Sequence, residues 1–74
     1  MAARKEYWVK FISQQWHVRH NQQTLSRHAA KASAVDAGVT VAKANQPSEL
    51  FICTEDGKIE DRRTYGNDPF PPRG

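Results

Sequence analysis

A single segment of this 74-residue chain has the composition and spacing of a helix, and it lies between segments typical of β-strands. From Ala29 to Asn45 the sequence is rich in alanine, with Val35, Val39 and Ala42 at positions i, i+4 and i+7. Pro47 disfavours helical geometry in the residue before it, so we expect the helix to end near residues 45–47. One helix with a shallow apolar stripe must be buried against a sheet.

Three strands are predicted before the helix. Residues 7–12 are aromatic and β-branched, and residues 16–20 alternate between apolar and polar side chains. Residues 24–28 form a weaker third strand with Leu25 as its apolar anchor. The polar segments 13–15 and 21–23 suit hairpin turns.

Two strands are predicted after the helix. Residues 49–54 form the first, and Asp56-Gly57 is typical of a two-residue hairpin turn. Residues 59–64 form the returning strand, which is mostly charged and is therefore expected at a sheet edge. The predicted fold class is α+β, a small antiparallel sheet packed on one helix in the order β-β-β-α-β-β. Residues 1–66 are expected to form one domain, followed by a proline-rich tail at 67–74.

Gly38 lies inside the predicted helix, where glycine costs about 1 kcal/mol relative to alanine. A close approach between the helix and the sheet is a physical reason for glycine at this position. The alanine-rich composition around it also indicates tight packing of the helix.

The length and the cysteine content limit how such a domain can be stabilised. A chain of 74 residues builds a thin core, and the single cysteine, Cys53, excludes an intrachain disulfide. We therefore expect a homodimer in which a second copy completes the core. The lone thiol and the absence of any signal-like or membrane-spanning apolar stretch predict a cytoplasmic protein that does not enter a membrane.

Charge is distributed unevenly along the chain. Residues 1–31 hold six basic side chains and one acidic side chain, whereas the remainder holds five basic and seven acidic ones. The basic first half is compatible with attraction to a polyanion. A net charge of +3 is also common on proteins that need charge only to remain soluble.

Several short motifs near the C-terminal end resemble one family of small bacterial proteins. They are Asp56-Gly57-Lys58-Ile59, Asp61-Arg62, Tyr65-Gly66, Asp68-Pro69 and Pro71-Pro72-Arg73-Gly74. In these motifs the chain resembles domain of unknown function family 2188 (DUF2188), whose members also contain an aromatic first strand, a Trp-containing second strand and an Ala-rich helix. The resemblance implies a β-β-β-α-β architecture with a C-terminal hairpin or arm, and it implies no particular activity. The resemblance implies that the residues of the family motif and of the tail make structural contacts. These residues are Asp56, Gly57, Tyr65, Gly66, Asp68, Pro69 and Phe70.

The residues that most often carry catalysis are poorly arranged for it in this sequence. Cys53 lies in an apolar strand without a glycine-rich turn beside it, and a buried free cysteine behaves as a small hydrophobe. The spacing of His17, His20 and His28 matches no recognised zinc site. We therefore expect no enzymatic activity, no cofactor and no metal site.

Binding is the remaining class of function, and one face of the predicted sheet is suited to it. If Tyr7, Val9, Phe11, Trp16 and Val18 face the core, the opposite face combines an aromatic ring with cationic groups. The predicted nucleic-acid-binding residues are Trp8, Lys10, His17 and Arg19, with Arg62 and Arg63 extending the surface.

A protein-interaction or structural homodimer module is the alternative. An exposed strand, or the face that carries Trp8, would then contact a second copy or another protein. The segment Pro69-Phe70-Pro71-Pro72-Arg73 also resembles a proline-rich docking ligand. The same segment could instead cover the thin core of its own domain.

Overall fold

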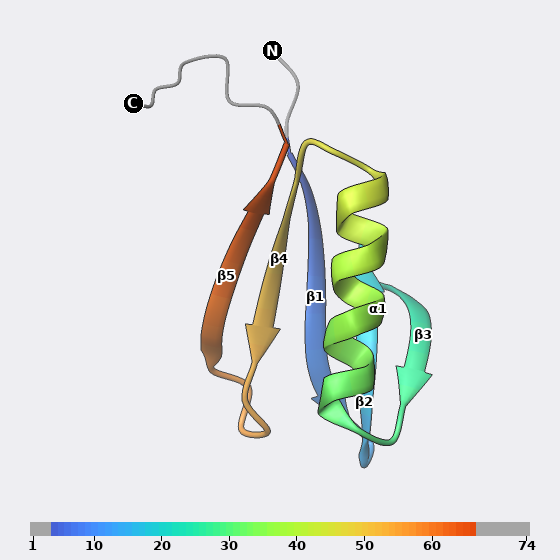
Figure 1. Ribbon diagram of the computed structural model, residues 1–74. Coiled ribbons are helices and arrows are strands. Elements are labelled where there is room, and N and C mark those ends of the chain that lie inside the picture. Colours follow the sequence, from blue (N-terminus) through green and yellow to red (C-terminus); the bar gives the residue numbers. More distant parts are fainter. Residues whose placement is uncertain (1–3, 67–74) are drawn as a thin grey trace.

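The computed structural model describes residues 4–66, in which one helix lies against one side of a five-stranded sheet (Figure 1). The elements are β1 (Lys5–Ile12), β2 (Gln15–His20), β3 (Gln23–His28), α1 (Lys31–Ala44), β4 (Ser48–Cys53) and β5 (Ile59–Tyr65). This order confirms the predicted β-β-β-α-β-β arrangement. The predicted proline-rich tail lies outside the described residues.

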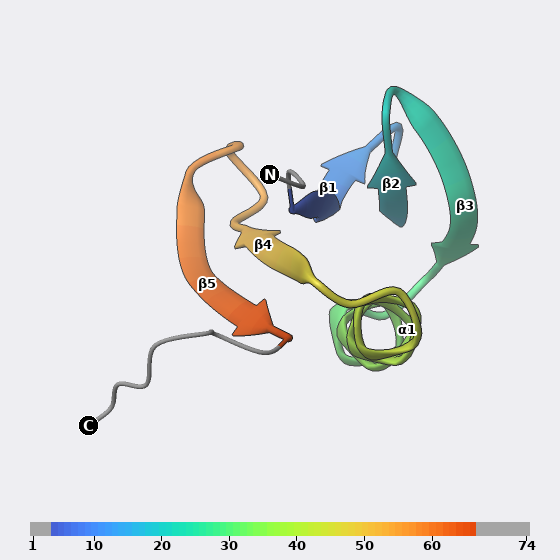
Figure 2. The same cartoon turned by 90° about the horizontal axis from the view of Figure 1, so that it is seen from above.

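The sheet is mixed, and the expectation of a wholly antiparallel sheet is wrong for one pair of strands. The strand order is β3-β2-β1-β4-β5, and β1 pairs with β4 in parallel. The other three pairs are antiparallel. The parallel pair arises because α1 carries the chain from the β3 edge back across the sheet, so β4 enters beside β1 in the same direction (Figures 1 and 2).

The connections between strands follow from a few turn residues. Two-residue turns at Ser13-Gln14 and Asn21-Gln22 have positive φ at all four residues, as the primed turns of tight hairpins require. Asp56-Gly57 also lies in a hairpin, but the connection runs from Thr54 to Lys58 and is longer than the predicted two residues. The Thr54 N–H donates to the Lys58 carbonyl at 2.7 Å and closes this loop.

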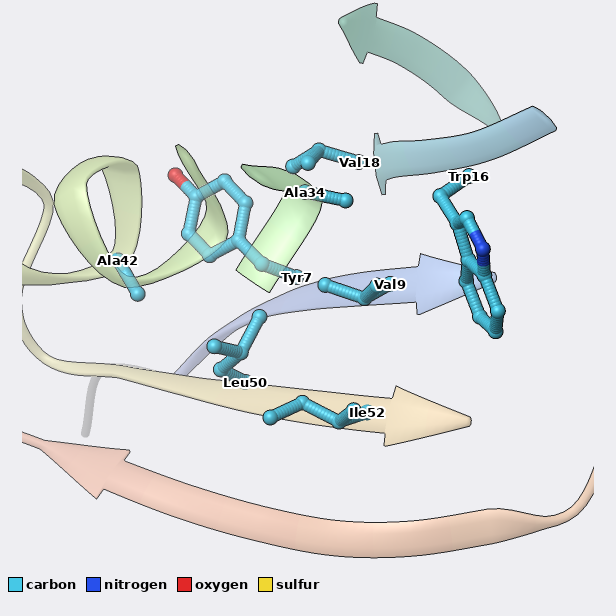
Figure 3. Close-up of a cluster of buried hydrophobic side chains, with 8 residues drawn as sticks. All are labelled: Tyr7, Val9, Trp16, Val18, Ala34, Ala42, Leu50 and Ile52. Atoms are coloured by element: carbon cyan, nitrogen blue, oxygen red, sulfur yellow. The ribbon is translucent and has the colours of Figure 1, made fainter. Parts of the chain in front are cut away.

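The core lies between α1 and the three central strands. Figure 3 shows side chains from β1, β2 and β4 directed toward the helix. The buried hydrophobic cluster consists of Tyr7, Val9, Trp16, Val18, Ala34, Ala42, Leu50 and Ile52. The predicted inward face of the first two strands is thereby confirmed for four of its five residues, while Phe11 is partly buried and packs at the margin.

The helix meets the sheet through its smallest residues. Ala34, Gly38 and Ala42 are the buried positions of α1, spaced four residues apart on one face. The sequence pattern placed Val35 and Val39 in the apolar stripe of the helix. In the structure both are only partly buried and lie beside the line formed by Ala34, Gly38 and Ala42. The line of small residues allows the helix backbone to approach the sheet closely.

Gly38 shows how close this approach is. A Cβ atom at this position would lie 3.0 Å from Leu50 Cδ1 and 3.2 Å from Val9 Cγ2, and both of these residues are fully buried. The predicted close approach at Gly38 is confirmed.

We predict that Gly38→Ala lowers the free energy of unfolding by about 1 kcal/mol, although alanine is the better helix former. Over-packing of a core costs about 1 to 3 kcal/mol, and the gain in helix propensity is about 1 kcal/mol. Urea denaturation would measure the difference. Thr40→Ala, at an exposed position of the same helix, serves as the control and should not destabilise the protein. A Gly38→Ala protein more stable than the wild type would contradict the packing argument.

The helix that the structure describes between residues 4 and 66 lacks the length and the apolar character needed to span a bilayer.

Candidate nucleic-acid interface

The side of the sheet that faces away from α1 carries a group of polar and aromatic side chains, here called the open face. Because successive residues of a strand point to opposite sides, the neighbours of the core residues lie on this side. The charged and aromatic residues of the open face include Glu6, Trp8, Lys10, His17, Arg19, Arg27, Glu49, Phe51 and Arg62. The sheet register pairs Trp8 with Arg19 and Lys10 with His17, so these four predicted residues share one face.

Two aromatic rings lie at the centre of the open face. Trp8 on β1 and Phe51 on β4 are directly paired, and their rings stack with centroids 4.3 Å apart. Arg62 lies 5.8 Å from the Phe51 centroid, and Lys10 Nζ lies 5.3 Å from the Trp8 centroid. Both rings are only partly buried. The result is an accessible aromatic pair with a cation on each side.

Arg19 continues this row on β2, and hydrogen bonds fix its position. Its Nη1 donates to Thr24 Oγ1 at 3.0 Å, and its Nη2 donates to the Gln22 carbonyl at 2.8 Å. These contacts use part of the guanidinium and leave further N–H groups, because arginine carries five. A guanidinium held in this way loses little entropy on contact with an anion.

A second row of basic side chains runs parallel to the first. The register places Lys10, His17 and Arg27 side by side on three neighbouring strands. His17 is 7% exposed, and its Nδ1 lies 3.2 Å from Thr24 Oγ1. His17 therefore contributes mainly to the packing of this face, whereas Arg27 is exposed.

Two carboxylates lie on the other side of the aromatic pair. Glu6 and Glu49 are directly opposite each other on β1 and β4. Glu49 Oε2 accepts a hydrogen bond from Arg62 Nη2 at 2.8 Å and has a side chain that is 13% exposed. Glu6 is exposed and takes part in none of the ion pairs formed within residues 4–66. The open face thus changes from acidic to aromatic to basic along the strand direction.

A cavity of about 510 Å³ opens on this face along β1. Residues of β1 form one wall, and Arg19, His20 and the β2–β3 turn form the other. The lining residues are Glu6, Trp8, Lys10, Ile12, Arg19, His20, Asn21 and Gln22. The cavity therefore contains an aromatic surface, two cations and one carboxylate.

Arg63 does not belong to the open face, in contrast to its predicted place there. It points to the helix side of β5, where its Nε donates to Asp61 Oδ2 at 3.2 Å. This hydrogen bond raises the pKa of the Arg63 guanidinium above its ordinary value. Arg62 and Arg63 are consecutive strand residues, so only one of them can share a face with Trp8.

The motif residues near the C-terminal end have structural roles where they are described. Thr54 Oγ1 donates to Asp56 Oδ1, and Gly57 adopts a φ of 92° in the same loop. The carbonyl of Tyr65, whose side chain packs against the core, accepts a hydrogen bond from Arg4 Nη1 at 3.0 Å. At Gly66, with a φ of 120°, a Cβ atom would lie 2.7 Å from Pro47 Cα. Asp68, Pro69 and Phe70 lie outside the described residues.

Cys53, His20 and His28 each have different surroundings. Burial raises the pKa of the Cys53 thiol above its ordinary value of 9.0, despite the opposing effect of nearby lysines. His20 stacks on Tyr7 at 4.6 Å, and His28 contacts Ser26 and Ser33. Within residues 4–66, no group of three or more His, Cys, Asp or Glu side chains is arranged to hold a metal ion.

We predict that Cys53 reacts slowly with a thiol reagent at neutral pH and rapidly once the protein is unfolded in urea. The pKa of the Cys53 thiol is raised in the folded state. The contribution of the protonated thiol to the free energy of unfolding is therefore fully present below pH 9.0 and is lost as the pH rises through the folded-state pKa. The loss of stability above pH 9.0 should therefore be smaller in Cys53→Ala than in the wild type. Identical pH profiles for the two proteins would contradict this assignment.

A family model covers most of the chain. Residues 7–65 match the model described as "Uncharacterized protein conserved in bacteria (DUF2188)". The chain belongs to the DUF2188 family. The family predicted from the sequence is thereby confirmed, and the DUF2188 match includes all five strands of the sheet except the first two residues of β1. No curated protein and no solved structure gives a significant match.

Four residues of the open face, Glu6, Arg27, Glu49 and Phe51, were missed by sequence reasoning, and Glu49 lies two residues before Phe51 on the same face of β4. Phe51 lies between Leu50 and Ile52, which are both buried, so strand alternation places it on the open face. This alternation could have been read from the sequence. Glu6 precedes the predicted start of the first strand by one residue. Arg27 depends on the register of β3, which shifts beside Val18 and Arg19 and has no sequence signature.

Proposed function

We propose that this DUF2188 protein binds single-stranded nucleic acid through its open face. The observation that carries the proposal is the row that crosses four strands of the sheet: Arg62, Phe51, Trp8 and Arg19. Such a row offers π surfaces for bases together with cations for phosphates.

The aromatic pair favours a single strand over a duplex. Bases in a single strand can leave their neighbours and stack on a protein ring, whereas duplex bases are already stacked within the helix. Stacking on an aromatic side chain contributes about 1 to 3 kcal/mol per base and tolerates any sequence. Trp8 and Phe51 are both partly exposed and cover one face of each other, so a base would stack on the opposite face of either ring, beside Lys10 or Arg62.

The charges of the open face support the same partner. Lys10, Arg19, Arg27 and Arg62 outnumber the two carboxylates, and the cations lie on either side of the rings. A phosphate backbone that passes the aromatic pair can therefore contact cations at successive positions. The residues described on this face offer aromatic surface and charge, which suit binding. We therefore propose a binding role and no catalytic one.

We predict that Arg62→Ala weakens binding of a fluorescent single-stranded oligonucleotide, whereas Arg63→Ala has little effect. The two residues are consecutive in β5, each pairs with an acidic side chain, and they differ in the face on which they lie. Each phosphate contact contributes about −0.7 to the slope of log K against log salt concentration for a single strand. Three contacts from Lys10, Arg19 and Arg62 give a slope of about −2, which Arg62→Ala should make less steep by about 0.7.

Trp8→Ala should cost about 1 to 3 kcal/mol of binding free energy and leave the salt slope nearly unchanged, because it removes stacking and no charge. Fluorescence anisotropy titrations at several salt concentrations would measure both quantities. Absence of salt-sensitive binding even at low salt would overturn the proposal. Equal losses from Arg62→Ala and Arg63→Ala would also show that the open face is not the interface.

A homodimer that buries Trp8 is the competing use of the same face. It would give a doubled mass by light scattering at about ten micromolar or above, and a Trp8→Lys variant would be monomeric. A dimer of this kind that does not bind oligonucleotides would decide against the nucleic-acid proposal.

A further inference from the structure

We infer that the cavity beside Trp8 selects guanine within a bound single strand, and that Glu6 determines this preference. The inference rests on the proposed function and adds a base preference to it. It is carried by the order of side chains in the cavity along β1.

Three side chains of the cavity follow one another on the same face of β1. Glu6, Trp8 and Lys10 are two residues apart, which corresponds to about 6.6 Å between successive side chains. The ring therefore lies between a carboxylate and an ammonium group, and Arg19 lies opposite the ring on β2. A nucleotide stacked on Trp8 with its phosphate toward Lys10 and Arg19 directs the free edge of its base toward Glu6.

A carboxylate at this edge discriminates among the bases. An ionised carboxylate only accepts hydrogen bonds, and it accepts two from a partner that offers two adjacent donors. Guanine presents its N1–H and N2–H groups side by side on its Watson–Crick edge. Adenine and cytosine place an acceptor beside their amino group, and thymine and uracil place a carbonyl on each side of their N3–H. These bases bring an acceptor against the carboxylate, which is repulsive.

Glu6 is the carboxylate available for this contact. Glu49 is its neighbour on the open face, but Glu49 is mostly buried and already binds Arg62 at 2.8 Å. Glu6 is exposed, lines the cavity and forms no ion pair with any residue from 4 to 66. His20 Nδ1 lies 2.9 Å from the Glu6 carbonyl and ties β1 to β2 at this end of the cavity.

The test uses short oligothymidines that carry one central guanine, adenine, cytosine or thymine, titrated against the full chain. Each strand carries at most one guanine, so the strands cannot form the folded structures that guanine-rich DNA adopts. We expect the guanine strand to bind about tenfold more tightly than the others, in line with one bidentate contact to a base. Glu6→Gln should abolish this preference while retaining binding to all four strands, because an amide no longer offers two acceptors.

Glu55→Gln is the matched control, since it removes the same charge from an exposed position in the β4–β5 connection. It should retain the guanine preference. Equal binding of all four strands by the wild type would overturn this inference and leave the proposed function standing. A preference that survives Glu6→Gln, or that is also lost in Glu55→Gln, would overturn the role of Glu6. If no strand binds, the proposed function and this inference both fail.

Discussion

The close contact between the helix and the sheet determines the rest of this structure. Ala34, Gly38 and Ala42 bring α1 against β1, β2 and β4, and the alternating residues of these strands fill the interface. This contact assigns one face of each central strand to the core. The other face is thereby fixed as well, because strand side chains alternate and a shift by one residue would expose the whole core.

A chain with one helix can cover one face of its sheet, so the side chains on the second face are not required for the core. In a small protein, neighbouring aromatic residues at such positions are candidates for an interaction surface. The Trp8–Phe51 stack is of this kind, because it lies away from α1 and its rings are flanked by Lys10 and Arg62. If the open face binds as proposed, the protein separates stability from recognition, with one function on each side of a single sheet.

The sequence was informative wherever hydrophobic alternation was strong. Alternation in β1 and β2 was sufficient to place Trp8, Lys10, His17 and Arg19 together, and the small residues of α1 indicated close packing. The parallel pairing of β1 with β4 depends on the path of the helix across the sheet, which no local pattern encodes. In β3 few apolar residues indicate which face is buried and the register shifts, so Arg27 was missed. Arg63 was misplaced because consecutive residues of β5 point to opposite faces and its few apolar residues did not indicate which of Arg62 and Arg63 shares a face with Trp8.

The register shifts in the two edge strands affect how this domain can associate. Between the paired positions, Leu25 is an extra residue in β3 and Glu60 is an extra residue in β5. In β5 the Arg62 N–H also donates to the neighbouring Asp61 carboxylate at 2.8 Å. Irregular, charged edges resist the addition of another strand, so the sheet does not readily extend sideways into a larger sheet. A homodimer, the competing use of the open face, would then form through that face and compete with a ligand, so that ligand occupancy would depend on the protein's own concentration.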